Sequence, residues 1–204
     1  AAKVLNDTNG GDFLDVLCAF QWLSSNHATL GTDIVNLSLG GGQFTGVCDN
    51  FDSFTQALAT EISALNNLDI TVFSSSGNDE FVGSMGLPAC LSNVVAVGAV
   101  WNTNFGAQSC DTSTAADQIT CFSNVDTTLD LLAPGAFTFA PNDTGGVIGM
   151  AGTSQASPAA AGVAALMLDA NGDLTPNEVR EILKATGVGI LDARDGNTYP
   201  RVDA

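Results

Sequence analysis

The sequence predicts an α/β fold in which a parallel β-sheet is covered by helices on both faces. Short apolar segments alternate with segments of helical periodicity along the 204 residues, as in strand–helix–strand units with right-handed crossovers. Hydrophobic residues make up 45% of the chain and charged residues only 13%, which indicates a large buried core. Because no repeat or linker interrupts the pattern, we expect a single domain over residues 1–204.

The first part of the chain supplies strands and helices in turn. The opening residues, AAKVL, have the composition of a strand, and the chain starts without Met, so we expect the N-terminal portion of the domain to lie elsewhere. Residues 13–26 carry apolar side chains at helical spacing, and so do residues 54–65. Residues 34–39 (IVNLSL) and 70–75 (ITVFSS) are apolar runs typical of buried strands, and turn sequences follow both.

The second part continues this alternation. Residues 94–100 (VVAVGAV) and 129–132 (LDLL) are predicted strands. Residues 152–168 form a long apolar segment rich in Ala, which we expect to be a buried helix. Thr175 to Glu178 form a capping box with proline at the first helical position, so a further helix is expected to run to about residue 185.

The charge of the chain excludes several kinds of partner. Twenty-two acidic residues against five basic ones give a net charge of −17. Such a chain is repelled by nucleic acids and by anionic membranes, so we expect neither as a partner. The sequence also holds no apolar run long enough to span a bilayer. This composition suits a soluble protein that is secreted or salt-tolerant.

The five cysteines favour an oxidising compartment. Cys110 and Cys121 flank a polar segment that a disulfide can close, and Cys48 and Cys90 lie in loop-like sequence and can form a second bridge. Cys18 falls within a predicted helix, where we expect a buried free thiol. No C-x-x-C pair is present, which argues against a zinc cage.

Polar residues gather where strands end. In a parallel sheet, ligands bind beyond the carboxyl ends of the strands. The turns Ser38 to Gly41 and Ser76 to Asp79 should therefore share one edge with the start of the helix after Gly152. Ser154, at that helix start, is a candidate nucleophile, and its own N–H and the Asn78 amide are candidate donors to an oxyanion. The backbone at residues 38–41 is suited to pairing with an extended peptide.

Several motifs together resemble the subtilisin-like serine proteases. GTSQASPAAAG (residues 152–162) resembles the nucleophile motif, IVNLSLGGG the substrate-binding strand, SSSGND the oxyanion segment and LDLLAPG the strand that precedes the nucleophile. The resemblance covers nearly the whole chain and implies that Ser154 is the nucleophile and Asn78 the oxyanion donor. It also implies that the primary specificity pocket is lined by six residues: Ser38, Leu39, Gly40, Ser75, Ser76 and Gly77.

The chain departs from the family in its catalytic base. The family's catalytic Asp and His motifs are not found in these 204 residues, and we expect both to precede residue 1. His27, the one histidine, is predicted to lie in a helix-to-strand loop at the amino-end edge of the sheet, about 20 Å from Ser154 across six strand residues. A general base must be within about 3 Å. Lys3 is expected to lie far from Ser154. A serine–lysine dyad would need a buried lysine, and neither Lys3 nor Lys184 is expected to be buried.

The resemblance leaves metal binding open. Many members of the family hold structural calcium, and a site here would use the carbonyl groups of Ser92 and Val94 with the carboxylate of Asp130. The chemistry itself requires no cofactor. Calcium needs six to eight converging oxygen atoms, which an acidic surface alone does not supply.

The leading hypothesis is a secreted serine endopeptidase of the subtilisin type that hydrolyses peptide or protein substrates through an acyl-serine intermediate. Without the Asp and His, the chain alone is expected to be inactive, with the missing N-terminal segment as a partner. The alternative is a non-catalytic, protease-like peptide-binding protein, which would have no need of Ser154 and Asn78. An α/β-hydrolase esterase is disfavoured, because residues 152–156 do not read G-x-S-x-G.

Overall fold

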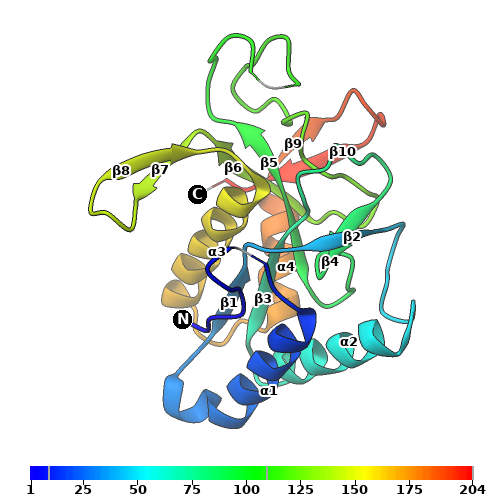
Figure 1. Cartoon of the computed structure of the whole chain (residues 1–204), viewed down its shortest axis with the longest axis vertical. Coiled ribbons are helices and arrows are strands. Elements are labelled where there is room, and N and C mark those ends of the chain that lie inside the picture. Colours follow the sequence, from blue (N-terminus) through cyan, green and yellow to red (C-terminus); the bar gives the residue numbers. More distant parts are fainter. Residues whose placement is uncertain (9, 109, 204) are drawn as a thin grey trace.

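A six-stranded sheet forms the centre of the molecule. The computed structural model describes residues 1–8, 10–108 and 110–203. The strand order is β1 (Ile34–Leu37), β3 (Thr71–Ser75), β5 (Val95–Trp101), β6 (Leu131–Ala136), β10 (Thr198–Arg201) and β9 (Val188–Leu191) (Figure 1). The first five are parallel, and β9 pairs antiparallel with β10. The predicted parallel sheet is therefore confirmed, and the structure adds two strands that were not predicted, the parallel β10 and the antiparallel β9.

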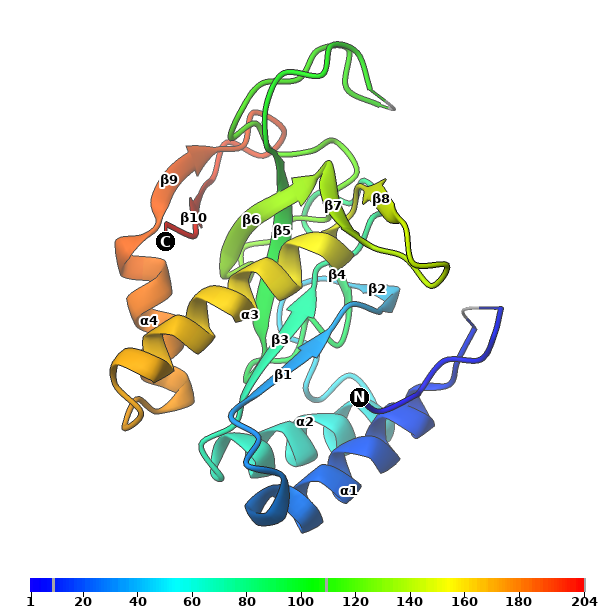
Figure 2. The same ribbon diagram turned by 90° about the vertical axis from the view of Figure 1, so that its left-hand side faces the viewer.

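Helices cover both faces of this sheet. α1 (Phe13–Leu30) and α2 (Ser53–Asn66) lie on one face, and α3 (Thr153–Ala170) and α4 (Pro176–Thr186) on the other (Figure 2). Neighbouring residues of β3 show why both faces must be covered. Val72 packs into the cluster with α1 and α2, whereas Phe73 packs into the cluster with α3 and α4, and both side chains are fully buried.

Two small antiparallel ribbons were not predicted. β2 (Gly41–Phe44) pairs with β4 (Met85–Leu87), and β7 (Thr138–Pro141) pairs with β8 (Val147–Met150). The β7–β8 hairpin projects from the body of the molecule and leads directly into α3 (Figure 2). It therefore carries the chain to the residue that the sequence marks as the nucleophile.

The ends of several predicted elements needed correction. Residues 1–5 do not form a strand; they are largely exposed, and Lys3 pairs with Asp7 at the surface. α1 runs on to Leu30, where Gly31 ends it in the left-handed conformation and donates its N–H to the His27 carbonyl oxygen. β1 is shorter than predicted and ends at Leu37.

The two predicted disulfides are confirmed. Cys48 is joined to Cys90 and Cys110 to Cys121. Cys18 is free but exposed, so the prediction of a buried thiol was wrong. The buried residues of α1, Val16 and Phe20, each lie two positions from Cys18, and a step of two residues points to the opposite side of a helix.

Candidate active site

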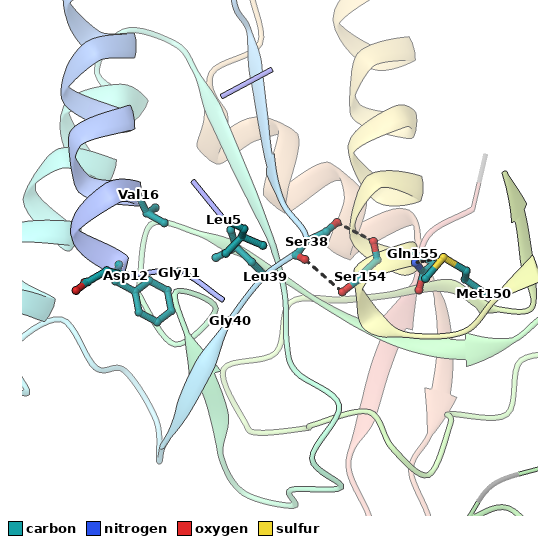
Figure 3. Close-up of a pocket in the computed structure, with 11 residues that line it drawn as sticks. Leu5, Gly11, Asp12, Val16, Ser38, Leu39, Gly40, Met150, Ser154 and Gln155 are labelled. Atoms are coloured by element: carbon teal, nitrogen blue, oxygen red, sulfur yellow. Dashed lines mark hydrogen bonds between the residues drawn. The ribbon is translucent and has the colours of Figure 1, made fainter. Parts of the chain in front are cut away.

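Ser154 lies in the first turn of α3, where a proline shapes its surroundings. Pro158 has no N–H to donate to the carbonyl oxygen four residues earlier, which is that of Ser154. That oxygen instead accepts a hydrogen bond from the Ser38 hydroxyl at 2.7 Å (Figure 3). In return, the Ser154 hydroxyl donates to the Ser38 carbonyl oxygen at 3.4 Å. The start of α3 is thus tied to the end of β1 by two hydrogen bonds.

A second network reinforces this junction, and sequence reasoning missed it. The Ser157 hydroxyl, which is fully buried, donates to Asn36 Oδ1 at 2.7 Å, and Asn36 Nδ2 donates to the Ser38 hydroxyl at 3.0 Å. The only signal in the sequence was a polar residue within an apolar strand. Asn36 is exposed, whereas the Ser157 hydroxyl is fully buried, so Ser157 is the member of the pair that requires a hydrogen-bond partner.

Asn78 lies beside Ser154 with its carboxamide held in one orientation. Asn78 Oδ1 accepts two hydrogen bonds from Thr153, from the backbone N–H at 2.8 Å and from the hydroxyl at 3.0 Å. Thr153 Oγ1 in turn accepts from the Gly77 N–H at 3.3 Å. Because the carbonyl end of the carboxamide is engaged, its Nδ2 end is left as the donor. The Ser154 N–H belongs to the first turn of a helix, where no intrahelical acceptor exists.

The candidate site opens into a cavity of about 500 Å³. Figure 3 shows Ser38, Leu39 and Gly40 on one side of Ser154, with Met150 and Gln155 on the other. Leu5 and the start of α1, including Asp12 and Val16, form the far wall. Ser38, Leu39 and Gly40 thus line the same cavity as Ser154. The other three residues assigned to specificity lie at the end of β3, where Ser75 and Ser76 are buried and Gly77 is half-buried.

His27 is not in the loop where the sequence placed it. It belongs to the last turn of α1, is half-buried, and its Nδ1 lies 2.9 Å from the Ser24 carbonyl oxygen. Phe13, which lines the cavity, is 14 residues earlier on the same helix, so at 1.5 Å per residue His27 is about 20 Å further along the axis. The expectation that His27 lies far from the site is supported, although its element was wrong.

The lysines are also engaged elsewhere. Lys3 pairs with Asp7, and Lys184 lies 3.5 Å from both Asp130 and Glu181. Lys184 belongs to α4, which follows the C-terminal end of α3, whereas Ser154 lies at the N-terminal end of α3 (Figure 2). The Ser154 hydroxyl instead donates to the Ser38 carbonyl oxygen. A carbonyl oxygen is too weak a base to remove the proton of the serine hydroxyl.

The calcium site suggested at Asp130 is filled by an arginine of the chain itself. Asp130 is 2% exposed, and its carboxylate accepts from Arg180 Nε at 2.7 Å and from the Ala96 N–H at 3.0 Å. Arg180 Nη1 donates to the Ser92 carbonyl oxygen at 2.6 Å. A calcium ion would have to displace this guanidinium, so the residues do not fit a metal here. Elsewhere in the described residues, no group of three or more His, Cys, Asp or Glu side chains is placed to hold one.

The fold and these contacts define a class of protein: an α/β protein with a serine in the first turn of a central helix and an oriented carboxamide beside it, as in serine hydrolases. None of the helices in the described ranges has the length and apolarity needed to cross a membrane. The comparisons with known proteins narrow this class.

A sequence profile of the subtilase family matches residues 1–200, and the chain belongs to that family. It is 34% identical over 204 residues to the halolysin-like extracellular serine protease Nep of Natrialba magadii, matching all of this chain and 32% of that protein. It is 31% identical to subtilisin DY of Bacillus licheniformis, matching 95% of this chain and 62% of that protein. The chain thus spans between about a third and three fifths of these relatives.

Solved structures agree with this assignment. The crystal structure of a cold-adapted subtilisin-like serine proteinase superposes with a TM-score of 0.76 at 26% identity, covering 99% of this chain and 66% of that one. The structure of sphericase gives the same TM-score at 22% identity, which supports the fold. Both the α/β architecture and the family predicted from the sequence are therefore confirmed.

Proposed function

We propose that this chain carries the nucleophile and the oxyanion hole of a serine endopeptidase of the subtilisin type. The observation that carries the proposal is the pair of hydrogen bonds from Thr153 to Asn78 Oδ1, because they leave Asn78 Nδ2 free to donate beside Ser154. The negative charge of a tetrahedral intermediate would be shared between this group and the Ser154 N–H. Donors held in place before the reaction need no reorganisation as charge develops.

The reaction proposed is hydrolysis of a peptide bond in two steps. Ser154 Oγ attacks the carbonyl carbon, its proton passes to a base, and the carbonyl oxygen becomes an oxyanion. The amine then leaves with that proton, which produces the acyl-serine, and water releases the acid by the reverse sequence. No cofactor takes part in this chemistry.

We propose that an extended peptide lies along the backbone of Ser38, Leu39 and Gly40. These residues line the cavity that contains Ser154, and a backbone at the end of a strand can pair with an added peptide strand. Ser75, Ser76 and Gly77, at the end of the adjacent strand β3, are proposed to form the wall of the primary specificity pocket.

The proposed base comes from outside the 204 residues. In the described part of the chain, no histidine or lysine is a hydrogen-bond partner of Ser154, which bonds to Ser38. β1 lies at the end of the sheet, beside this junction. A segment carrying the family's Asp and His could reach Ser154 from that side. We therefore propose that this chain alone turns over peptides very slowly or not at all. We also propose that it is secreted, in line with its disulfides and its extracellular relative Nep.

Chemical rescue tests this proposal. The isolated chain should react slowly with a fluorophosphonate, and added imidazole should accelerate labelling of Ser154 because a small base can enter the open cavity. Labelling is followed by intact mass, and the modified residue is located by peptide mapping. Ser154→Ala should abolish the reaction, and Asn78→Ala should slow it about a hundredfold, which is typical for loss of one oxyanion donor.

Two outcomes would contradict the proposal. Rapid peptide turnover without imidazole would show that the chain already has a base. Labelling that is unaffected by Asn78→Ala would remove the oxyanion assignment and favour a protein that binds peptides without cutting them.

A further inference from the structure

Asn124 is a buried side chain that bonds to the loop carrying Asn78. It is fully buried, and all the atoms of its carboxamide that can form hydrogen bonds are directed at residues 76–81. Asn124 Oδ1 accepts from the N–H groups of Asp79 at 2.9 Å and Phe81 at 3.0 Å. Asn124 Nδ2 donates to the Ser76 carbonyl oxygen at 3.2 Å and to Asp79 Oδ2 at 3.1 Å.

These four bonds attach the loop on both sides of Asn78. Ser76 precedes Asn78, and Asp79 and Phe81 follow it. The backbone adds a further contact, because the Asn124 N–H donates to the Gly77 carbonyl oxygen at 3.0 Å. The loop therefore cannot shift at either end without breaking bonds to one buried side chain.

Gly77 shows how close this contact is. Its φ is +110°, a conformation that residues with a side chain rarely adopt, and a Cβ there would lie 2.2 Å from Asn124 Nδ2. Glycine at this position thus serves both the backbone conformation and the approach of Asn124. The resulting path of the backbone brings Asn78 to Thr153.

We infer that Asn124 is a positioning residue that holds the Asn78 carboxamide in the orientation required of an oxyanion donor. Asn124 does not touch Ser154 or Thr153 in the contacts described, so it acts through the loop. An effect of Asn124 on catalysis rests on the proposed function, whereas its effect on the orientation of Asn78 does not.

A backbone amide that Asn124 does not contact provides the first test. The Thr153 N–H donates to Asn78 Oδ1, so its hydrogen exchange reports whether Asn78 is in place. In Asn124→Ala, we expect the protection of this amide to fall about tenfold, as after loss of one hydrogen bond, and to match Asn78→Ala. Amides of β5 should change only as much as global stability changes, as measured by urea unfolding.

Two further variants make the test specific. Asn124→Asp retains the size of the side chain and an acceptor for the Asp79 and Phe81 amides, but it loses both donated bonds and places a carboxylate near Asp79. The protection of the Thr153 amide should therefore also fall in this variant. If Asn124→Ala does not fold, Asn124→Asp provides the test. Ser123→Ala is the matched control. Ser123 is equally buried, but its hydroxyl accepts from Ala99 of β5 and donates to the backbone carbonyl oxygen of Asn124, so it bonds neither to the loop nor to the Asn124 carboxamide.

A native level of Thr153 protection in the Asn124 variants would overturn the inference, and so would an equal loss in Ser123→Ala. The fluorophosphonate rate separates this inference from the proposed function. If both hold, Asn124→Ala should slow labelling, but should have no further effect in an Asn78→Ala background. Loss of Thr153 protection with an unchanged labelling rate would preserve the positioning role and refute the oxyanion role of Asn78.

Discussion

The carbonyl oxygen of Ser154 illustrates how a single residue can redirect a hydrogen bond. A helix normally satisfies such an oxygen from four residues later, and Pro158 prevents this. The Ser38 hydroxyl donates to this oxygen instead. Pro158 thus removes a hydrogen bond within α3 and leaves the oxygen available for one between α3 and the residue after β1. The position of Ser154 relative to the cavity depends on this exchange.

Ser38→Ala should therefore destabilise the protein by about 0.5–1.5 kcal/mol, because the Ser154 carbonyl oxygen loses its hydrogen bond to the Ser38 hydroxyl. Pro158→Ala restores a backbone N–H at residue 158, which can donate to the Ser154 carbonyl oxygen as in a regular α-helix. In the Pro158→Ala background, Ser38→Ala should cost clearly less. Urea unfolding of the four proteins gives the coupling energy, and strictly additive effects would contradict the explanation.

Most residues of the candidate site could be named from the sequence, because they follow recognisable strands and open a recognisable helix. Asn36, Ser157 and Asn124 could not. Asn36 and Ser157 are 121 residues apart, and Asn124 is 45 residues from Asp79. Only the fold brings such partners together, and each looks like an ordinary strand, helix or turn residue on its own.

At the scale of elements, prediction worked best where long apolar segments determine the outcome. Strands β1, β3, β5 and β6 and helices α1 to α4 were found, because burial on two faces imposes a continuous apolar pattern, whereas the short strands β9 and β10 were not predicted. The β2–β4 and β7–β8 ribbons were missed, since their strands have three or four residues and are largely exposed or rich in glycine. Residues 1–5 have the composition of a strand but do not form one in the structure, which shows that composition alone does not create a strand.

The capping box of α4 allows a prediction about pH. The N–H and hydroxyl of Thr175 hold the pKa of Glu178 below its ordinary value of 4.5. A carboxylate with a lowered pKa stabilises the fold above its unfolded pKa, and this contribution is lost as the pH falls through the folded pKa. Thr175→Ala should therefore raise the pKa of Glu178 toward 4.5 and lower the urea midpoint at pH 7, with a smaller difference at pH 3.

NMR titration of Glu178 and unfolding at the two pH values check this prediction. Thr186→Ala is a suitable control, because Thr186 is at the other end of α4 and donates to the Ile182 carbonyl oxygen. It should leave the pKa of Glu178 unchanged. An equal loss of stability at both pH values in Thr175→Ala would contradict a role for the Glu178 charge.

At the scale of the whole molecule, the net charge of −17 on 204 residues should make stability depend on salt. Like charges repel more strongly in the compact state than in the unfolded chain, and salt screens this repulsion over a Debye length of about 10 Å at 0.1 M. We expect the thermal midpoint to rise by several degrees between about 10 mM and 1 M salt.

Circular dichroism at a range of NaCl and KCl concentrations tests this expectation. Both salts should act alike if screening is the cause, and an equal osmolality of sucrose should not reproduce the shape of the curve. A midpoint that falls with added salt would show that the ion pairs of the chain, such as that between Arg201 and Asp117, contribute more than the net repulsion.

The ion pair between Arg180 and Asp130 has a consequence for how this fold keeps its shape in different surroundings. A dissolved ion leaves its site when the medium is depleted of it, whereas a cation built into the chain stays at a fixed effective concentration for as long as the chain is folded. The contact between α4 and the sheet thus has its positive charge, on Arg180, within the chain itself. Chelators and dilution therefore cannot remove the cation from this contact while the chain stays folded.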